Sequence, residues 1–354
     1  MGYLSEQPVE LGKMTCGNRI IRSATHSFLG SKDGHMTDAE YAMYETLAKN
    51  SVGTIITGHV CVMRGGRANP EQIVLWEDAD IPQFTKAAQI VQAQGAKLVV
   101  QISHAGPRTI EDVEPADVVA RPLKKGRKAR ALTVEEIHAV EEAFIQAAVR
   151  LQKAGVDGVQ LHAAHSYLLS RFLDPTFNQR EDLYGGNAEG RFRIVEEILR
   201  GIRSACGEDF PVWIKINVDT KADAAAYRED MLYILNRCRE LGVTLAELSG
   251  VDFINQPKTA RLYYLEQAAE LRRKVDLPMS LVGGVRSLSD MERVLSSGMD
   301  MVSLSRPLIA EPDFVTKSLQ GQEKSICVSC CRCFVLPNMH PGMRCVWERK
   351  KKKQ

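Results

Sequence analysis

The 354-residue chain lacks the features that would place it in several special classes of protein. No apolar stretch reaches the roughly 18 residues of a membrane-spanning helix, and residues 1–12 show no apolar segment of the signal-peptide type. The net charge is only +2, so the composition gives no reason to expect nucleic acid or a membrane as a partner. We therefore expect a globular protein of the cytoplasm.

The nine cysteines are distributed unevenly, with five of them between residues 327 and 345. In a chain without an export signal, this crowding favours metal ligation over disulfide bonds. Four of the thiols are spaced as ligands of one metal centre, which leaves Cys331 over. The four are Cys327, Cys330, Cys333 and Cys345. An iron–sulfur cluster, a zinc ion and a metal-free tail are the three alternatives.

The chain also lacks a G-x-G-x-x-G motif after its first strand-like run, which disfavours a doubly wound nucleotide-binding sheet. Short β-branched runs alternate instead with amphipathic stretches. The eight runs are residues 19–23, 52–57, 97–102, 158–161, 212–217, 244–248, 279–282 and 301–304. Eight strand–helix units in one domain predict an α/β fold, the closed (β/α)8 or TIM barrel.

Helix signals fill the intervals between these runs. Residues 132–136 are typical of a capped helix start, and a long apolar period follows them to Leu151. Residues 189–202 and 287–295 have the same periodicity. We expect residues 1–321 to form the barrel and residues 322–354 to form a cysteine-rich extension that is not an independent domain.

Polar and small residues follow the predicted strands, at the end of a barrel that carries chemistry. After the seventh and eighth strands, Gly283, Gly284 and Arg306 suit a phosphate group, because the glycines expose backbone N–H groups and the arginine supplies a planar cation. The alternative is a glycine turn beside a surface arginine. Lys215 interrupts the apolar fifth strand, either as one half of a salt bridge or as a cation beside an electron-accepting ring.

His162, His165 and Tyr167 follow the fourth strand closely. Two imidazoles and a phenol suit carbonyl activation, in which the imidazoles polarise the oxygen and the tyrosine donates a proton. Two other interpretations stay open. The histidines could bind a metal ion with a third ligand supplied by the fold, or they could be hydrogen-bonded core residues.

With these residues in place, the chain resembles the old yellow enzyme family of FMN-dependent ene-reductases over residues 11–320. The resemblance rests on the order and spacing of several motifs. They are Gly17-Asn18-Arg19-Ile20 with Ser23, Gln101-Ile102-Ser103-His104-Ala105-Gly106, residues 157–165, residues 172–191, Gly283-Gly284 and Ser305-Arg306-Pro307-Leu308.

The resemblance implies FMN as cofactor, with NADH or NADPH as electron donor. The residues that it places around FMN are Ser23, Ala24, Thr25, His26, Gly58 and Gln101 at the ring, Lys215 near N1 and C2, and Gly283, Gly284, Ser305 and Arg306 at the phosphate. It further implies that reduced flavin N5 delivers hydride to a carbon–carbon double bond conjugated to a carbonyl. His162 and His165 would stabilise the enolate oxygen, and Tyr167 would donate the proton.

Two other functions remain open on the sequence. The larger branch of the same family includes amine dehydrogenases and demethylases, so an amine substrate is the alternative enzyme interpretation. A histidine pair suits a carbonyl oxygen better than an amine. The other alternative is a catalytically idle binding protein on a zinc-stabilised barrel, and it would be colourless.

Three features depart from the common family pattern. His26 stands where a small residue, cysteine or threonine is usual, and it resembles the dienoyl-CoA reductase and trimethylamine dehydrogenase branch. Gln160 stands in place of a frequent glutamate. The cysteine tail resembles the [4Fe–4S] motif of that branch, and the sequence ends nine residues after Cys345. We therefore expect a separate electron-transfer partner protein, and association into a homo-oligomer is a further expectation.

Overall fold

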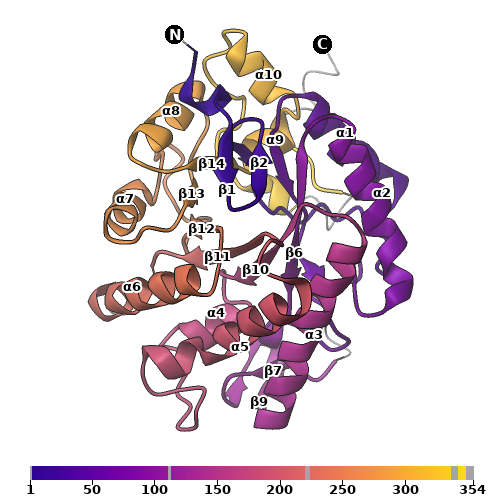
Figure 1. Ribbon diagram of the computed structural model, residues 1–354, viewed down its shortest axis with the longest axis vertical. Helices are drawn as coiled ribbons and strands as arrows, with labels where there is room; N and C mark the ends of the chain where they lie inside the picture. Colours follow the sequence, from indigo (N-terminus) through magenta and orange to yellow (C-terminus); the bar gives the residue numbers. More distant parts are fainter. Residues whose placement is uncertain (1, 111–112, 220–223, 336–341, 348–354) are drawn as a thin grey trace.

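The computed structural model describes residues 2–110, 113–219, 224–335 and 342–347, and it contains the predicted barrel (Figure 1). Eight parallel strands pair in chain order, and the pairing of β10 with both β6 and β11 closes the ring. The strands are β3 (Ile20–Arg22), β4 (Thr54–Ile56), β6 (Lys97–Ser103), β10 (Gly158–Ala163), β11 (Val212–Asn217), β12 (Leu245–Ser249), β13 (Met279–Val282) and β14 (Met301–Leu304). Each lies within two residues of the run predicted for it.

Helices surround the ring on its outer side, as Figure 1 shows. They are α1 (Asp38–Lys49), α2 (Ile81–Gln92), α3 (Val134–Lys153), α4 (Leu168–Leu173), α5 (Ala188–Cys206), α6 (Ala224–Glu240), α7 (Leu265–Lys274), α8 (Leu288–Ser296), α9 (Arg306–Ala310) and α10 (Phe314–Leu319). Outward-facing strand residues such as Leu161 pack with helix residues such as Phe144 and Ile198 in one large apolar core.

The start of α3 has the capping box that the sequence predicts. The Thr133 hydroxyl accepts a hydrogen bond from the Glu136 backbone N–H at 3.2 Å, and the Glu136 carboxylate accepts one from the Thr133 N–H at 2.9 Å. These bonds satisfy two N–H groups that a helix start leaves without partners. The cap therefore fixes where this long outer helix begins.

A hairpin that the sequence did not reveal closes one end of the barrel. Strands β1 (Val9–Leu11) and β2 (Met14–Cys16) pair antiparallel, and their buried side chains pack with Trp213, Leu245 and Met301. These three lie in the first half of their strands, so the hairpin covers the N-terminal end of the ring. An apolar layer fills this part of the interior, and ligands are left with the opposite end.

Other short strands also escaped the sequence analysis. They are β5 (Val60–Cys61), which adds to β6, and the small sheet of β7 (Ala116–Asp117), β8 (Arg121–Pro122) and β9 (Lys128–Ala131). The small sheet is held to the barrel by a buried, two-pronged ion pair in which Arg171 of α4 contacts both carboxylate oxygens of Asp117 at 2.7 Å. The loop between β6 and α3 is thereby fixed near the strand ends.

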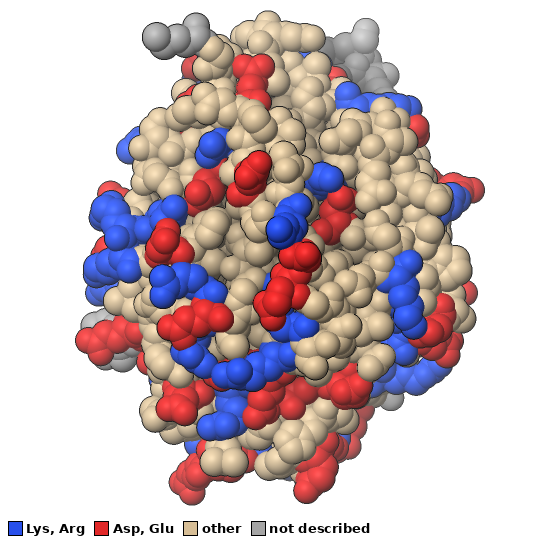
Figure 2. Space-filling model, in the orientation of Figure 1, with Lys and Arg blue, Asp and Glu red and all other residues tan. Residues whose placement is uncertain are grey.

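The surface shows no field of one sign on the face drawn in Figure 2, where acidic and basic side chains are interspersed. This agrees with the near balance of 46 basic and 44 acidic residues. Among the described helices, none combines the length and the apolar character that crossing a bilayer requires.

The hairpin gives a stability prediction. Leu11 is 1% exposed, so Leu11→Ala should lower the free energy of unfolding by about 2–5 kcal/mol through lost contacts and a cavity. Glu10→Ala, at an exposed position of the same strand, is the matched control and should change stability little. Chemical denaturation measures both. Equal stability of the two variants would show that the hairpin does not contribute to the core.

Candidate active site

A continuous row of buried polar side chains crosses the barrel interior above the apolar layer. Gln101 donates to Gln160 at 2.7 Å, and Gln160 donates to the Glu247 carboxylate at 3.1 Å. Lys215 lies 3.2 Å from the same carboxylate oxygen and donates to the Ser23 hydroxyl at 2.7 Å. Strand register produces the row, because Gln160 pairs with Gln101, and Lys215 pairs with Glu247.

Both sequence interpretations of Lys215 are compatible with this geometry. It has a salt-bridge partner, Glu247, which sequence analysis did not single out although it lies in the sixth predicted strand. The ammonium is nevertheless in the interior, next to Ser23 at the strand ends, with a side chain only 3% exposed. The row also gives Gln160 a place, since it connects Gln101 to the acidic partner of Lys215.

The histidine pair and Tyr167 meet at the end of β10. The ring centres of His162 and His165 are 5.6 Å apart, and those of His162 and Tyr167 are 4.5 Å apart. The His165 ring nitrogen Nε2 shares a hydrogen bond with Ser249 at 2.9 Å, and its backbone N–H donates to Asn217 at 3.3 Å. The backbone at His165 is left-handed, with φ of 58°, a conformation common at functional sites.

His59 is a member of this group that sequence analysis passed over. Its Nε2 lies 3.3 Å from the Tyr167 hydroxyl, and its Nδ1 lies 2.6 Å from the Gln72 amide. His26 packs beside it, with ring centres 4.8 Å apart, and bonds Asn69 at 3.0 Å. The available signal was position, because His59 directly follows Gly58 at the end of the second predicted strand.

The environment keeps these imidazoles neutral. Desolvation lowers the pKa of His165 to about 3 and that of His26 to about 4. Desolvation, followed by the neighbouring histidines, holds the pKa of His162 well below its usual range. Desolvation also raises the pKa of the Tyr167 hydroxyl. At neutral pH the site therefore offers imidazoles with one N–H each and a protonated phenol.

The His162 ring also retains capacity for a ligand. Its Nδ1 is buried and has no hydrogen-bond partner among the described residues. A buried polar atom without a partner is costly unless something else meets it. The metal interpretation of this pair gains no support. Among the described residues, the ligand atoms that lie close enough for a metal ion belong to a different group, on the outer helices α3 and α5.

The remaining ring-site residues lie at neighbouring strand ends. Gly58 packs so closely on the segment after β3 that an added Cβ would lie 3.2 Å from the Thr25 carbonyl oxygen and His26 Cα. The Thr25 hydroxyl is 2.9 Å from that of Ser305, which joins this segment to the end of β14. Ala24 packs on the apolar layer below.

The ends of β13 and β14 form a second polar region. Gly283 and Gly284 have φ of 144° and 73°, and an added Cβ on Gly284 would lie 2.6 Å from the Leu262 nitrogen. One cavity is lined by both glycines, Ser305 and Arg306. Arg306 is only 8% exposed, so the surface-arginine alternative is wrong. Its guanidinium donates to the Tyr263 hydroxyl at 3.2 Å and to Cys331 Sγ at 3.0 Å.

The tail cysteines gather on the other side of Arg306. One small cavity is lined by Arg306 and by all five tail thiols, Cys327, Cys330, Cys331, Cys333 and Cys345. Cys331 is therefore not remote from the group, although the spacing pattern left it over. Burial first, and then the neighbouring cysteines, raise the pKa of Cys333 to about 12. The four predicted ligands, Cys327, Cys330, Cys333 and Cys345, do not lie close enough together in the described structure to bind one metal ion.

The site residues fit FMN in two respects. The glycine cavity with Arg306 suits a phosphate, since side chains are excluded there and backbone N–H groups can approach. The buried row presents a cation, amides and a hydroxyl beside the strand ends, where a polar ring system needs hydrogen-bond partners.

Comparison with known proteins agrees with this assignment. A sequence profile described as the NADH:flavin oxidoreductase / NADH oxidase family matches residues 7–325. The chain is similar to an NADH oxidase from Thermoanaerobacter brockii, with 32% identity over 90% of this chain and 52% of that protein. It is also similar to an NADPH dehydrogenase from Listeria innocua, with 29% identity over 90% of this chain and 94% of the relative.

Among solved structures, the fold is similar to that of a 2-naphthoyl-CoA reductase in complex with 2-naphthoyl-CoA. The TM-score is 0.82 at 24% identity, over 90% of this chain and 52% of that one. The chain thus spans about half the length of this reductase and of the T. brockii oxidase. Because the profile covers most of the sequence, the chain belongs to the NADH:flavin oxidoreductase / NADH oxidase family, whose enzymes are FMN-dependent oxidoreductases.

Proposed function

We propose that this protein reduces a carbon–carbon double bond conjugated to a carbonyl, with NADH or NADPH as the source of electrons. The observation that carries the proposal is the group of His162, His165 and Tyr167, in which desolvation keeps both imidazoles neutral and the phenol protonated. Donors of this kind suit an oxygen that gains negative charge during the reaction. An amine nitrogen would gain nothing comparable from two N–H donors.

FMN supplies the hydride chemistry when it is bound. Gly283, Gly284, Ser305 and Arg306 would hold its phosphate, and Lys215 would lie near N1 and C2 of the ring. Ser23, Ala24, Thr25, His26, Gly58 and Gln101 would line the ring site. The support is that the hydroxyl groups of Thr25 and Ser305 share a hydrogen bond of 2.9 Å, so the ring region and the phosphate cavity adjoin.

His162 and His165 would bind the substrate carbonyl oxygen from one side. Ser249 and Asn217 fix the His165 ring and backbone, while the His162 Nδ1 has no partner among the described residues. Held in this way, the two rings need no rearrangement as negative charge grows on the oxygen. A neutral ring is the useful form. It still offers one N–H to the substrate oxygen, and it leaves no charge buried in the site before the substrate binds.

Tyr167 would protonate the α-carbon of the substrate. Its hydroxyl lies 3.3 Å from His59, which contacts Gln72 at 2.6 Å. Once the hydroxyl has given its proton to the substrate, His59 is therefore a hydrogen-bonded neighbour that can supply another. Desolvation raises the pKa of Tyr167, so the phenol stays protonated over the neutral range.

The substrate class has one further support. The solved structure with a similar fold holds a CoA thioester whose carbonyl is conjugated with an aromatic ring. We propose an unsaturated carbonyl compound of the enone, enal or dienoyl type as the substrate here. Simple enones such as cyclohexenone are the first probe, and formaldehyde release from methylated amines is the contrasting assay.

Tyr167→Phe should slow enone-dependent reoxidation of the reduced enzyme by about 10²-fold, because the proton donor is lost. Reduction of the flavin, whether by NADH, NADPH or a chemical reductant such as dithionite, should proceed at the wild-type rate. Stopped-flow spectroscopy measures the two half-reactions separately. Tyr233→Phe, a half-buried tyrosine of α6, is the control. Formaldehyde release without enone consumption by the wild-type protein would contradict the proposal itself.

Lys215→Met should shift the midpoint potential of bound FMN downward, because a cation no longer stabilises the anionic reduced form. The single variant also leaves Glu247, which is 0% exposed, as an uncompensated charge, and should be destabilised by about 3–5 kcal/mol. Lys215→Met combined with Glu247→Gln should regain stability while the potential stays low. Thermal melts and spectroscopic potentiometry provide the two readouts. A normal potential in the double variant would remove Lys215 from the flavin site.

For the tail we propose a [4Fe–4S] cluster held by Cys327, Cys330, Cys333 and Cys345, within residues 322–354 as an extension of the barrel of residues 1–321. The support is that these thiols line one cavity although they are too widely spaced for a single ion. A cluster separates its thiolates more widely than one ion does. Such a centre would pass electrons from a separate partner protein to the flavin.

Protein purified without oxygen should contain about four iron atoms and about four acid-labile sulfides per chain. Cys345→Ser should lose this iron, whereas Cys206→Ser, at a position outside the tail, should retain it. Iron-free wild-type protein would contradict the cluster. Rapid single-turnover reduction of the flavin by NADH or NADPH alone would contradict the need for a partner.

A further inference from the structure

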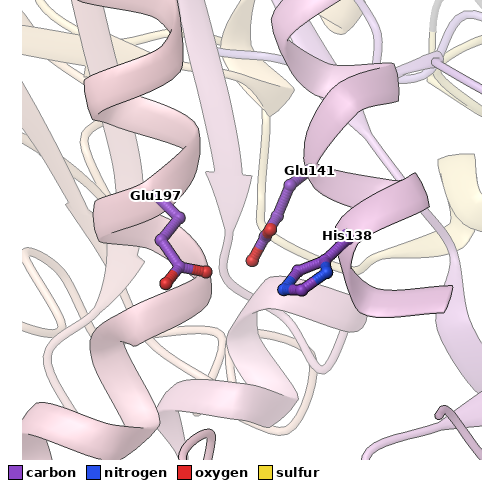
Figure 3. A group of neighbouring side chains, drawn as sticks. All are labelled: His138, Glu141 and Glu197. Carbon is purple, nitrogen blue, oxygen red and sulfur yellow. The ribbon is translucent and has the colours of Figure 1, made fainter. Parts of the chain in front are cut away.

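A group of ionisable side chains lies on the outer helices, away from the strand ends. His138 and Glu141 are three residues apart on α3, so they project from the same face of that helix. Glu197 projects toward them from the neighbouring helix α5, as Figure 3 shows. One ligand atom from each residue lies within 4.8 Å of those of the other two.

Glu141 is the central member of this group. It is 7% exposed, and its Oε1 has no hydrogen-bond partner among the described residues. Figure 3 shows its carboxylate directed into the space between His138 and Glu197. A buried carboxylate oxygen without a partner is costly, so its position requires an occupant that meets it.

The neighbouring groups leave room for such an occupant. Tyr184 donates to Oε2 of Glu197 at 2.7 Å, and Arg193 reaches only to 3.9 Å from Oε1. The imidazole of His138 is exposed to solvent and its ring centre is 6.3 Å from that of Tyr184. Two carboxylates therefore face a gap that opens to solvent at His138.

A shared proton is the simplest occupant. Burial, followed by the facing Glu197, raises the pKa of Glu141 to about 9. Like charges this close are unfavourable unless one carboxyl keeps its proton or a cation joins them. The two occupants make different predictions, because only a cation brings His138 into the group.

We propose that His138, Glu141 and Glu197 bind a divalent transition-metal ion of the Zn²⁺ type. One imidazole and two carboxylates form a ligand set that such ions take, with three protein ligands and an open position for water. At bond lengths of about 2.1 Å, the ligand atoms of a tetrahedral ion lie about 3.4 Å apart. The present atoms lie within 4.8 Å of one another, so changes of side-chain rotamer, above all at the exposed His138, would have to close the difference. Mg²⁺ prefers oxygen ligands, so a set that includes an imidazole favours a Zn²⁺-type ion over it.

A bound ion would connect α3 to α5 and to the loop before α5. Tyr184 lies in that loop, and Asn178 holds the loop by donating to the carbonyl oxygens of Tyr184 at 2.7 Å and of Phe172 at 2.8 Å. Phe172 belongs to α4, which begins directly after Tyr167. The site would therefore stabilise the support of α4, and its effect is on stability and does not depend on the proposed reaction.

The test uses the full-length, FMN-loaded protein titrated with Co²⁺ as a spectroscopic substitute for Zn²⁺. Co²⁺ should raise the melting temperature of the wild-type protein and bind it at least tenfold more tightly than it binds Glu141→Gln or His138→Ala, since loss of a ligand weakens binding by roughly 10-fold or more. Glu141→Gln should fold normally, because the amide resembles the protonated carboxyl. Glu142→Gln, at an exposed neighbouring position, is the matched control and should behave as the wild type.

The tail cysteines are the same in all four proteins, so any Co²⁺ that they take up cancels in the comparison and the difference between variants isolates the helix site. Thiolate ligation further gives intense near-ultraviolet bands, which a site of nitrogen and oxygen ligands lacks. An equal Co²⁺ response in the wild type and Glu141→Gln would overturn the proposal, as would an equal response to Mg²⁺. Enone reduction is measured on the same samples, so the failure of either proposal is visible separately.

Discussion

The ion pair between Lys215 and Glu247 determines the character of the barrel interior. Both side chains are almost fully buried, 3.2 Å apart. An ammonium in such a place would be prohibitively costly alone, and so would the carboxylate. Each makes the other possible, and the carboxylate in turn needs the Gln160 amide. The polar row is therefore one unit, because the loss of any member leaves its neighbours without partners.

This pair also influences the chemistry at the strand ends. His162 is paired with Lys215 in the register of β10 and β11. The positive charge adds to desolvation in lowering the pKa of both His162 and His165. A single cation thus serves two purposes, since it compensates the buried carboxylate of Glu247 and it helps to keep the imidazoles uncharged.

The sequence predicted much of the fold because local signals agree with it. The β-branched runs at residues 212–217 and 301–304 became strands with those same bounds, and the capping box of α3 is formed. Candidate site residues could be chosen from the sequence where a strand end and a chemical type coincide, as for Arg306 and His165, and their roles stay predictions. Glu247, His59 and the hairpin were not, because their roles depend on partners distant in the sequence. Glu247 is one charged residue in a strand until register places it beside Lys215. The hairpin has too few residues to show a period.

The hairpin at the N-terminal end of the barrel has a consequence for the response to ionic strength. By packing against Trp213, Leu245 and Met301 it separates the buried row from bulk solvent on that side. Mobile ions screen charges over about 8 Å at physiological ionic strength, but only where they can approach. The mixed charges of the outer surface are open to such screening. The buried charge of Lys215 is not open to such screening from the hairpin side. Added salt should therefore alter how charged molecules meet the outer surface, while the electrostatic potential around Lys215 stays the same.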